Sequence, residues 1–172
     1  MKKTSKKILI TGGAGFIGSN TAFYFSKKGW KIYLIDNLSR KGSKNNLFNL
    51  RKNIKIKFYK ADVSNFKKIS KIIKNIKPNL LIHCAGQVTV TKSIVNPRND
   101  FNSNAFGSFN ILESIRLFSN KSKFINISTN KVYGDVSNKK ISEINKRYRF
   151  LGKTKSIDES YPLDLYSPYG CS

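Results

Sequence analysis

The chain has 172 residues, 39% of them hydrophobic, which suits one compact domain with its own core rather than a disordered tail. No apolar run approaches the roughly 20 residues that a membrane helix needs. The basic N-terminus is followed by an apolar stretch, Ile8–Ile10, that is too short for a secretion signal. We therefore expect one domain over residues 1–172 of a cytoplasmic protein that binds no membrane.

The charge is strongly unbalanced, with 33 basic residues, 9 acidic residues and a net charge of +24. Such a charge is typical of proteins that bind nucleic acid or an anionic surface. Only six of the basic residues are arginines, however, and the lysines are spread along the chain, which favours a compositional origin. We expect no specific nucleic-acid partner, although the positive field would attract an anionic substrate.

The sequence offers little material for metal or disulfide chemistry. It contains two cysteines, Cys84 and Cys171, and one histidine, His83. These residues cannot form a zinc site without several carboxylates, and the sequence has no such cluster. Two free thiols fit a reducing compartment, and we predict no metal site.

Apolar runs separated by turn residues predict strands that alternate with helices. The predicted strands are Lys7–Thr11, Lys31–Ile35, Ile54–Tyr59, Leu80–His83 and Lys123–Ser128. The predicted helices are Phe16–Lys28, Ser43–Leu50, a helix that is capped by Ser64 and ends near Ile76, and a long helix from Pro97 to about Ser119. This alternation predicts an α/β fold with a doubly wound, Rossmann-like parallel sheet of strand order 3-2-1-4-5.

The segment after Gly134 differs from the rest of the chain. It is polar, and it contains Pro162 and Pro168. We expect an irregular surface excursion that leads towards another helix, with that helix and the later strands of the sheet lying beyond Ser172.

A glycine-rich turn joins the first predicted strand to the first predicted helix. Its glycines, Gly12, Gly15 and Gly18, allow a tight turn, let backbone N–H groups approach a pyrophosphate, and let the helix pack on the strand. Asp36 ends the second predicted strand, where its carboxylate can accept hydrogen bonds from both hydroxyls of an adenosine ribose. The alternative is a turn-forming role for Asp36 before Asn37. Glycine spacing alone is weak evidence, but its combination with Asp36 predicts dinucleotide binding.

The third predicted strand is followed by Asp62 and Val63. An aspartate at this place can accept a hydrogen bond from the adenine amino group, and a valine can cover the ring. The alternative is that Asp62 caps the next helix, and the two roles are compatible.

The fourth predicted strand ends in small residues, which let the backbone pass close to a cofactor. These are Ala85 and Gly86, followed by Gln87. The preceding pair, His83 and Cys84, cannot form a thiolate–imidazole pair because neighbours on a strand point to opposite faces. A packed strand-end histidine is expected instead.

Hydroxyl residues follow the fifth predicted strand at Ser128 and Thr129, and Tyr169 lies some forty residues further on. This order fits a scheme in which a phenolate takes a proton from a sugar hydroxyl while a hydride leaves for a nicotinamide. Taken alone, Tyr169 would be an ordinary surface tyrosine.

The whole series of motifs resembles the extended short-chain dehydrogenase/reductase family of nucleotide-sugar epimerases and dehydratases. The resemblance covers essentially the whole chain and rests on residues 36–42, 85–88, 128–135 and 167–172. Within that family, the Asn130-Lys131 pair after Thr129 resembles the corresponding residues of the 2-epimerases that act on CDP-sugars.

The resemblance implies a bound NAD cofactor and transient oxidation of a nucleotide sugar at C2, with a CDP-sugar as the implied substrate. It implies that Thr129 orients the sugar hydroxyl, that Tyr169 is the base, and that Asn104 fits the asparagine of the family's long-helix motif. The implied cofactor-binding residues are Gly12, Gly15, Phe16, Ile17, Gly18, Asp36, Asn37, Asp62, Val63, Ala85, Gly86, Gln87, Asn104 and Ser128.

The family motif is Tyr-x-x-x-Lys, and the lysine position after Tyr169 lies one residue beyond Ser172. We therefore expect an N-terminal fragment, without the substrate domain, that is inactive alone and homo-oligomeric when full length. Three alternatives remain open. One is a 4-epimerase, a 4,6-dehydratase or a decarboxylase of the same family, although dehydratases usually carry acidic residues where this chain has Asn130 and Lys131. The others are a non-catalytic dinucleotide-binding module and a charge-driven nucleic-acid binder.

Overall fold

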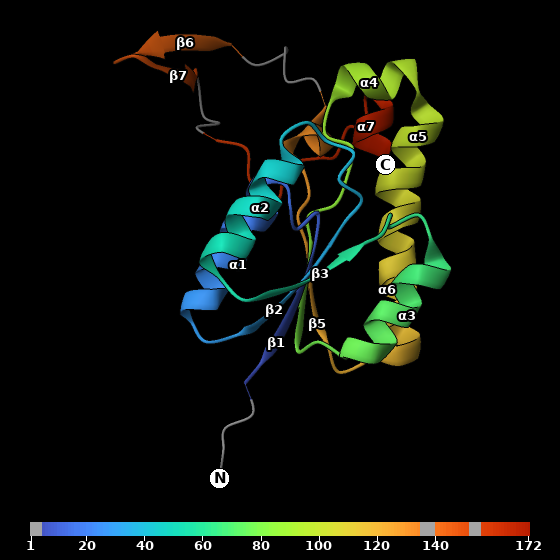
Figure 1. Ribbon diagram of the computed structural model, residues 1–172. Helices are drawn as coiled ribbons and strands as arrows, with labels where there is room; N and C mark the ends of the chain where they lie inside the picture. The colour runs from blue at the N-terminus through green and yellow to red at the C-terminus, as the bar shows by residue number, and fades with distance from the viewer. Residues whose placement is uncertain (1–4, 135–139, 152–155) are drawn as a thin grey trace.

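The computed structural model describes residues 5–134, 140–151 and 156–172. Asp135, part of one motif above, lies outside the described residues. A sheet of five parallel strands forms the centre of the fold, in the order β3-β2-β1-β4-β5, which confirms the predicted fold class (Figure 1). The strands are β1 (Lys7–Thr11), β2 (Lys31–Asp36), β3 (Ile56–Lys60), β4 (Leu80–His83) and β5 (Lys123–Asn126).

Two layers of helices cover the sheet (Figure 1). Helices α1 (Phe16–Lys27) and α2 (Ser43–Asn53) lie on one face, and α3 (Phe66–Ile76) and α6 (Gly107–Phe118) lie on the other. The alternation of side chains along β1 divides the core accordingly, since Ile8 and Ile10 point to one face and Leu9 to the other. All three are fully buried, and such a side chain contributes roughly 1.5–3 kcal/mol of hydrophobic stabilisation.

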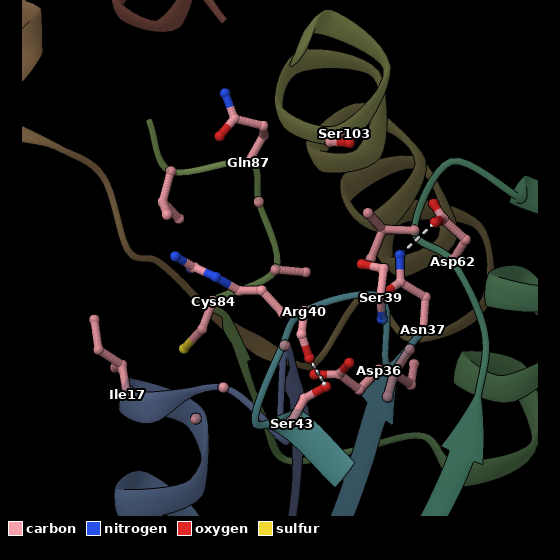
Figure 2. A pocket seen from close by; sticks show the side chains of 18 of the residues that line it. Ile17, Asp36, Asn37, Ser39, Arg40, Ser43, Asp62, Cys84, Gln87 and Ser103 are labelled. Carbon is pink, nitrogen blue, oxygen red and sulfur yellow. Dashed lines mark hydrogen bonds between the residues drawn. The ribbon is translucent and has the colours of Figure 1, made fainter. Parts of the chain in front are cut away.

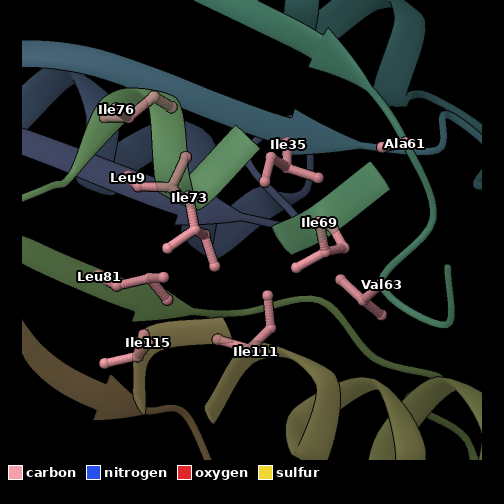
Figure 3. Packing of buried hydrophobic residues seen from close by; sticks show 10 residues of the cluster. All are labelled: Leu9, Ile35, Ala61, Val63, Ile69, Ile73, Ile76, Leu81, Ile111 and Ile115. Carbon is pink, nitrogen blue, oxygen red and sulfur yellow. The ribbon is translucent and has the colours of Figure 1, made fainter. Parts of the chain in front are cut away.

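Isoleucines dominate the core beneath α3 and α6, as Figure 3 shows. Ile69 and Ile73 lie four residues apart on one side of α3, and Ile111 and Ile115 do the same on α6. These pairs meet Leu9 of β1 and the neighbouring strands, so they fix both helices on the sheet and hold its carboxyl-end loops in place.

The predicted long helix from Pro97 to Ser119 is interrupted. A short helix, α4 (Val90–Val95), precedes it and was not predicted; then α5 (Pro97–Phe101) passes into a π-helical turn, η1 (Asn102–Phe106), before α6 begins. Pro97 cannot continue α4 because it lacks an N–H, and Asn96 caps the new helix by accepting a hydrogen bond from the Asn99 N–H. Six-residue helices carry too little periodicity to be recognised in a sequence.

Element ends differ from prediction in several places. Strand β3 begins at Ile56 rather than Ile54, and β5 ends at Asn126 rather than Ser128. The cap of α3 is Asn65, whose side chain accepts from the Lys68 N–H at 3.0 Å, so the assignment of the cap to Ser64 was wrong. The hydroxyl of Ser64 donates instead to Asp62.

The prediction of irregular structure after Gly134 was also wrong in part. Strands β6 (Ile141–Ile144) and β7 (Arg147–Phe150) form an antiparallel hairpin. Its two linking residues, Asn145 and Lys146, both have positive φ angles, as in the tight turns that suit hairpins.

The short helix η2 (Asn130–Tyr133) follows β5, and α7 (Pro168–Cys171) lies near the C-terminus. The N-terminal turn of the expected last helix is therefore present, capped by Ser167, which accepts a hydrogen bond from the Gly170 N–H. Helix α7 packs against α4, α5 and η2 at the carboxyl end of the sheet.

Candidate functional site

A pocket of about 690 Å³ opens at the carboxyl ends of the strands. The loops after β1, β2, β3 and β4 all contribute to it, and Figure 2 labels Asp36, Asp62 and Gln87 among the residues that line it. In doubly wound sheets ligands bind at this edge, where the strand order reverses between β1 and β4. The predicted residues that line it are Gly12, Gly15, Phe16, Ile17, Gly18, Asp36, Asn37, Asp62, Val63, Ala85, Gly86 and Gln87.

The glycine turn leaves no room for side chains. A Cβ on Gly18 would stand 2.2 Å from the carbonyl oxygen of Gly12, and one on Gly12 would stand 2.7 Å from the backbone of Cys84 and Ala85. Gly12 also has a φ of +63°. This close packing aims the start of α1 at the pocket, where Gly15 offers no side-chain cap and the first N–H groups lack intrahelical partners. Such a helix start binds a phosphate.

Asp36 is held by the backbone on both sides. Its Oδ2 accepts from the Ala14 N–H at 3.0 Å, and its Oδ1 accepts from the Leu38 N–H at 2.8 Å. A carboxylate has about four acceptor sites, so these two bonds orient the group and leave capacity for a diol in the pocket that it lines.

Asp62 lines the pocket from the loop after β3, next to Asn37. Its Oδ2 accepts from the Asn37 side chain at 2.7 Å, and its Oδ1 accepts from the N–H and hydroxyl of Ser64. Burial alone raises the pKa of Asp62, but the hydrogen bonds from Asn37 and Ser64 outweigh it and hold the pKa below its usual value. The helix-capping alternative for Asp62 was wrong, because Asn65 caps α3.

His83 and Cys84 point to opposite sides of the sheet, as predicted. The hydroxyl of Thr11 accepts from the Ala85 N–H and is hydrogen-bonded to Nδ1 of His83, and Nε2 of His83 is hydrogen-bonded to the Ser108 hydroxyl. Burial lowers the pKa of His83 to about 4 and raises the pKa of Cys84 to about 11. At neutral pH both groups are uncharged, so the histidine is structural and the thiol is unreactive.

The loop after β4 is fixed by Asn104, which lies in η1. Its side-chain oxygen accepts from the Gln87 N–H at 2.7 Å, and its side-chain nitrogen donates to the Gln87 carbonyl and to the Ser172 hydroxyl. A Cβ on Gly86 would stand 2.9 Å from the same oxygen. The structure therefore places Asn104 behind the pocket, as a support for the loop rather than among its lining residues.

The predicted catalytic residues lie at two elements in contact, η2 and α7. Thr129 precedes η2 and caps it: its hydroxyl oxygen accepts from the Lys131 N–H at 3.2 Å, which leaves the hydroxyl proton free to donate. Tyr169 lies in α7, and its N–H donates to the buried Ser93 hydroxyl of α4 at 3.2 Å. The buried Gly170 lets α7 approach the Lys131 carbonyl closely. Ser128 is exposed, and neither it nor Thr129 nor Tyr169 lines the pocket.

Several pocket residues were not assigned from the sequence. They include Ser39, Arg40, Ser43, Val88, Thr89, Lys92, Asn99 and Ser103. Ser39 and Arg40 lie three and four residues after Asp36, so their place after a strand could have revealed them; Figure 2 shows them near Asp36. Lys92 lies in α4, which the sequence did not predict, and Asn99 lies in α5.

Two features are absent from the described part of the chain. Residues 5–134, 140–151 and 156–172 hold no group of three or more metal-ligating side chains. Within the same described ranges, none of the helices has the length and apolar character to cross a membrane.

Comparison with known proteins identifies the family. The family described as GDP-mannose 4,6 dehydratase matches residues 9–172, and the chain belongs to it, which confirms the predicted extended short-chain dehydrogenase/reductase relationship. The chain is 43% identical to the CDP-paratose 2-epimerase of Salmonella typhi over 96% of its own length and 49% of that protein. The chain thus spans about half the length of this curated relative.

Solved structures of relatives share the fold. The UDP-Glc/GlcNAc 4-epimerase of Campylobacter jejuni aligns with a TM-score of 0.81 and 32% identity, over 97% of this chain and 45% of that one. The UDP-glucose 4-epimerase of Bifidobacterium longum, in complex with NAD⁺ and UDP, aligns with a TM-score of 0.78 and 25% identity, over 96% of this chain and 45% of that one.

Proposed function

We propose that this chain forms the NAD-binding part of a nucleotide-sugar epimerase, and that its substrate is a CDP-sugar epimerised at C2. The proposal rests on one observation: the glycine turn, Asp36 and the loop after β4 line the same pocket. Helices η2 and α7, next to which Thr129 lies and in which Tyr169 lies, contact each other at the same end of the sheet. The 43% identity to CDP-paratose 2-epimerase supports the choice of sugar nucleotide.

The residues of the pocket fit an adenine dinucleotide. The pyrophosphate would lie at the start of α1, where Gly15 and Gly18 bring backbone N–H groups close. The ribose diol would bind Asp36, and the adenine amino group would donate to Asp62. Asp36 would repel the 2′-phosphate of NADP, so NAD is the proposed cofactor. When bound, NAD would supply a hydride acceptor for oxidation of the sugar carbon and a hydride donor for its reduction.

The chain's own catalytic groups would move and hold a proton. Thr129 would donate a hydrogen bond to the reacting sugar hydroxyl, and the Tyr169 phenolate would remove the proton of that hydroxyl. A phenol with a pKa near 10 must be shifted by about 3 units to act near neutral pH, roughly 4 kcal/mol of electrostatic stabilisation. A cation next to the phenol, such as the lysine of the family motif, would supply part of it.

A 4,6-dehydratase is the second candidate, because the matching family carries that description. Dehydratases need an acid and a base to eliminate water next to the keto group. The two residues after Thr129 are Asn130 and Lys131, neither of which is acidic. These residues therefore favour the epimerase.

The test uses residues 1–172 joined to the C-terminal half of the Salmonella typhi relative, hereafter the joined enzyme. We expect it to convert CDP-paratose to CDP-tyvelose with NAD⁺, and to leave dTDP-glucose and GDP-mannose undehydrated. Tyr169→Phe should nearly abolish turnover without weakening NAD binding, and Thr129→Ala should lower kcat by less. Near-normal turnover of Tyr169→Phe would exclude Tyr169 as the base, and a dehydrated product would favour the second candidate.

A further inference from the structure

A buried carboxylate, Asp100 of α5, has no role in the scheme above. Its residue is fully buried, and no ion pair found among the described residues reaches it. Burying an ionised carboxylate costs several kcal/mol unless hydrogen bonds compensate. Such a group is a poor choice for packing alone, so its hydrogen-bond partners indicate its role.

The two oxygens of Asp100 bind two different parts of the site. Oδ1 accepts from the Gln87 side-chain amide at 2.7 Å, and Oδ2 accepts from the Ser172 hydroxyl at 2.5 Å. Gln87 lines the cofactor pocket. Ser172 immediately follows α7, the short helix that carries Tyr169. One carboxylate thus connects the cofactor loop to the tyrosine.

Both ends of this connection are well fixed. The Gln87 side chain also donates to the Thr89 carbonyl and accepts from the Thr89 N–H at 2.7 Å, so its amide can present a proton to Asp100 in one orientation only. The Ser172 hydroxyl, which donates to Asp100, accepts from the Asn104 side chain at 3.0 Å. Asp100 and Asn104 lie four residues apart along α5 and η1, and together they hold Gln87 and Ser172.

Helix α7 has only four residues and cannot hold its own position. Its two ends are fixed by different contacts: Ser93 accepts from the Tyr169 N–H, and the Ser172 hydroxyl donates to Asp100 while it accepts from Asn104. The contact with Ser93 fixes the start of the turn, and the contacts of Ser172, of which Asp100 is the buried acceptor, oppose rotation of the turn about that point.

We propose that Asp100 is a positioning residue, whose carboxylate sets the place of Tyr169 relative to the cofactor loop by bridging Ser172 and Gln87. The inference rests on the proposed function, in which Tyr169 is the base. Its consequence is specific: the loss of Asp100 displaces the tyrosine, whereas the loss of a buried hydrogen bond elsewhere in the fold does not.

The test measures the position of Tyr169 directly, without turnover. The 172-residue chain is labelled with 3-fluorotyrosine, and the ¹⁹F resonance of Tyr169 among the eight tyrosines is assigned with Tyr169→Phe. Asp100→Leu, which removes both hydrogen bonds, should move this resonance towards the shift of unfolded tyrosine. Asp100→Asn, which can accept from Gln87 and donate to Ser172, should restore most of the native shift. Ser172→Ala should move the resonance in the same direction as Asp100→Leu.

Ser114→Ala is the matched control. It removes another fully buried hydrogen bond, from the Ser114 hydroxyl to the Asn110 carbonyl in α6, and should leave the Tyr169 resonance in place. If Asp100→Leu does not fold, Ser172→Ala alone decides. A native Tyr169 resonance in the folded Asp100→Leu or Ser172→Ala variant would overturn the proposal. The proposed function fails separately, if Tyr169→Phe keeps turnover in the joined enzyme.

Discussion

Gly18→Ala tests how closely the glycine turn is packed, because close packing and helix propensity predict opposite effects of this substitution on stability. Gly18 lies within α1, where alanine is favoured over glycine by about 1 kcal/mol. The added Cβ would stand 2.2 Å from the Gly12 carbonyl oxygen, against 3.4 Å for ordinary contact, and 2.8 Å from the Gly13 Cα. Both neighbours are backbone atoms, so no side chain can rotate away.

The sizes of these two effects decide whether Gly18→Ala raises or lowers the free energy of unfolding. Overpacking of this kind costs about 1–3 kcal/mol or more, which exceeds the gain in helix propensity, so we expect a net loss of about 1–2 kcal/mol in unfolding free energy. The displacement would also move the start of α1 away from the proposed position of the pyrophosphate. Loss of one hydrogen bond to a charged phosphate costs about 1.5–3 kcal/mol, or tenfold or more in the Kd for NAD⁺.

The assay combines urea unfolding, followed by circular dichroism, with calorimetric titration of NAD⁺. Gly29→Ala is the matched control, since Gly29 has a φ of +76° but nothing within 4 Å of the added Cβ. It should cost about 1–2 kcal/mol of stability through backbone strain and leave the Kd unchanged. A folded Gly18→Ala variant that binds NAD⁺ as tightly as the original chain would refute the proposed role of this turn.

Three further predictions concern single residues. His83 is the single histidine, and burial lowers its pKa from 6.5 to about 4, so the unfolded chain binds one more proton than the folded chain between these pH values. The free energy of unfolding should therefore drop by about 3 kcal/mol as the pH falls from 6.5 to 4. Urea titrations at a series of pH values measure this loss, and His83→Gln should reduce it. Asp36→Ala should weaken NAD⁺ binding and relax discrimination against NADP⁺ in paired titrations; tighter NADP⁺ binding by the original chain would contradict the assignment. Asn65→Ala should cost about 1 kcal/mol by removing the cap on Lys68, and an unchanged urea midpoint would exclude that cap.

The parts of the site that the sequence predicted are those fixed within one strand–turn–helix unit. The glycine turn and Asp36 depend on local backbone geometry, so residue type and spacing were sufficient to place them. The five-stranded sheet followed from the alternation of apolar runs, such as Ile8–Ile10 and Leu80–Ile82, with helical segments.

The remaining features depend on contacts between distant residues. Ser172 lies 72 residues from Asp100 and 68 from Asn104, and no local pattern reveals that a serine and a buried aspartate will meet. Helix α4 and the β6–β7 hairpin were missed for another reason. Helix α4 has six residues and each strand of the hairpin has four, so even the alternation of Arg147–Phe150 is too short to stand out as a strand pattern.

The most direct measurement follows the hydrogen at C2 of the sugar. CDP-paratose carrying deuterium at C2 is incubated in ordinary water with the joined enzyme and NAD⁺, and the isotope content of the CDP-tyvelose is measured. Because the cofactor takes and returns the same hydride, the account predicts that the product retains its deuterium at C2. Replacement of that deuterium by hydrogen from water would show that C2 is deprotonated instead, and would contradict the proposed NAD-dependent epimerisation.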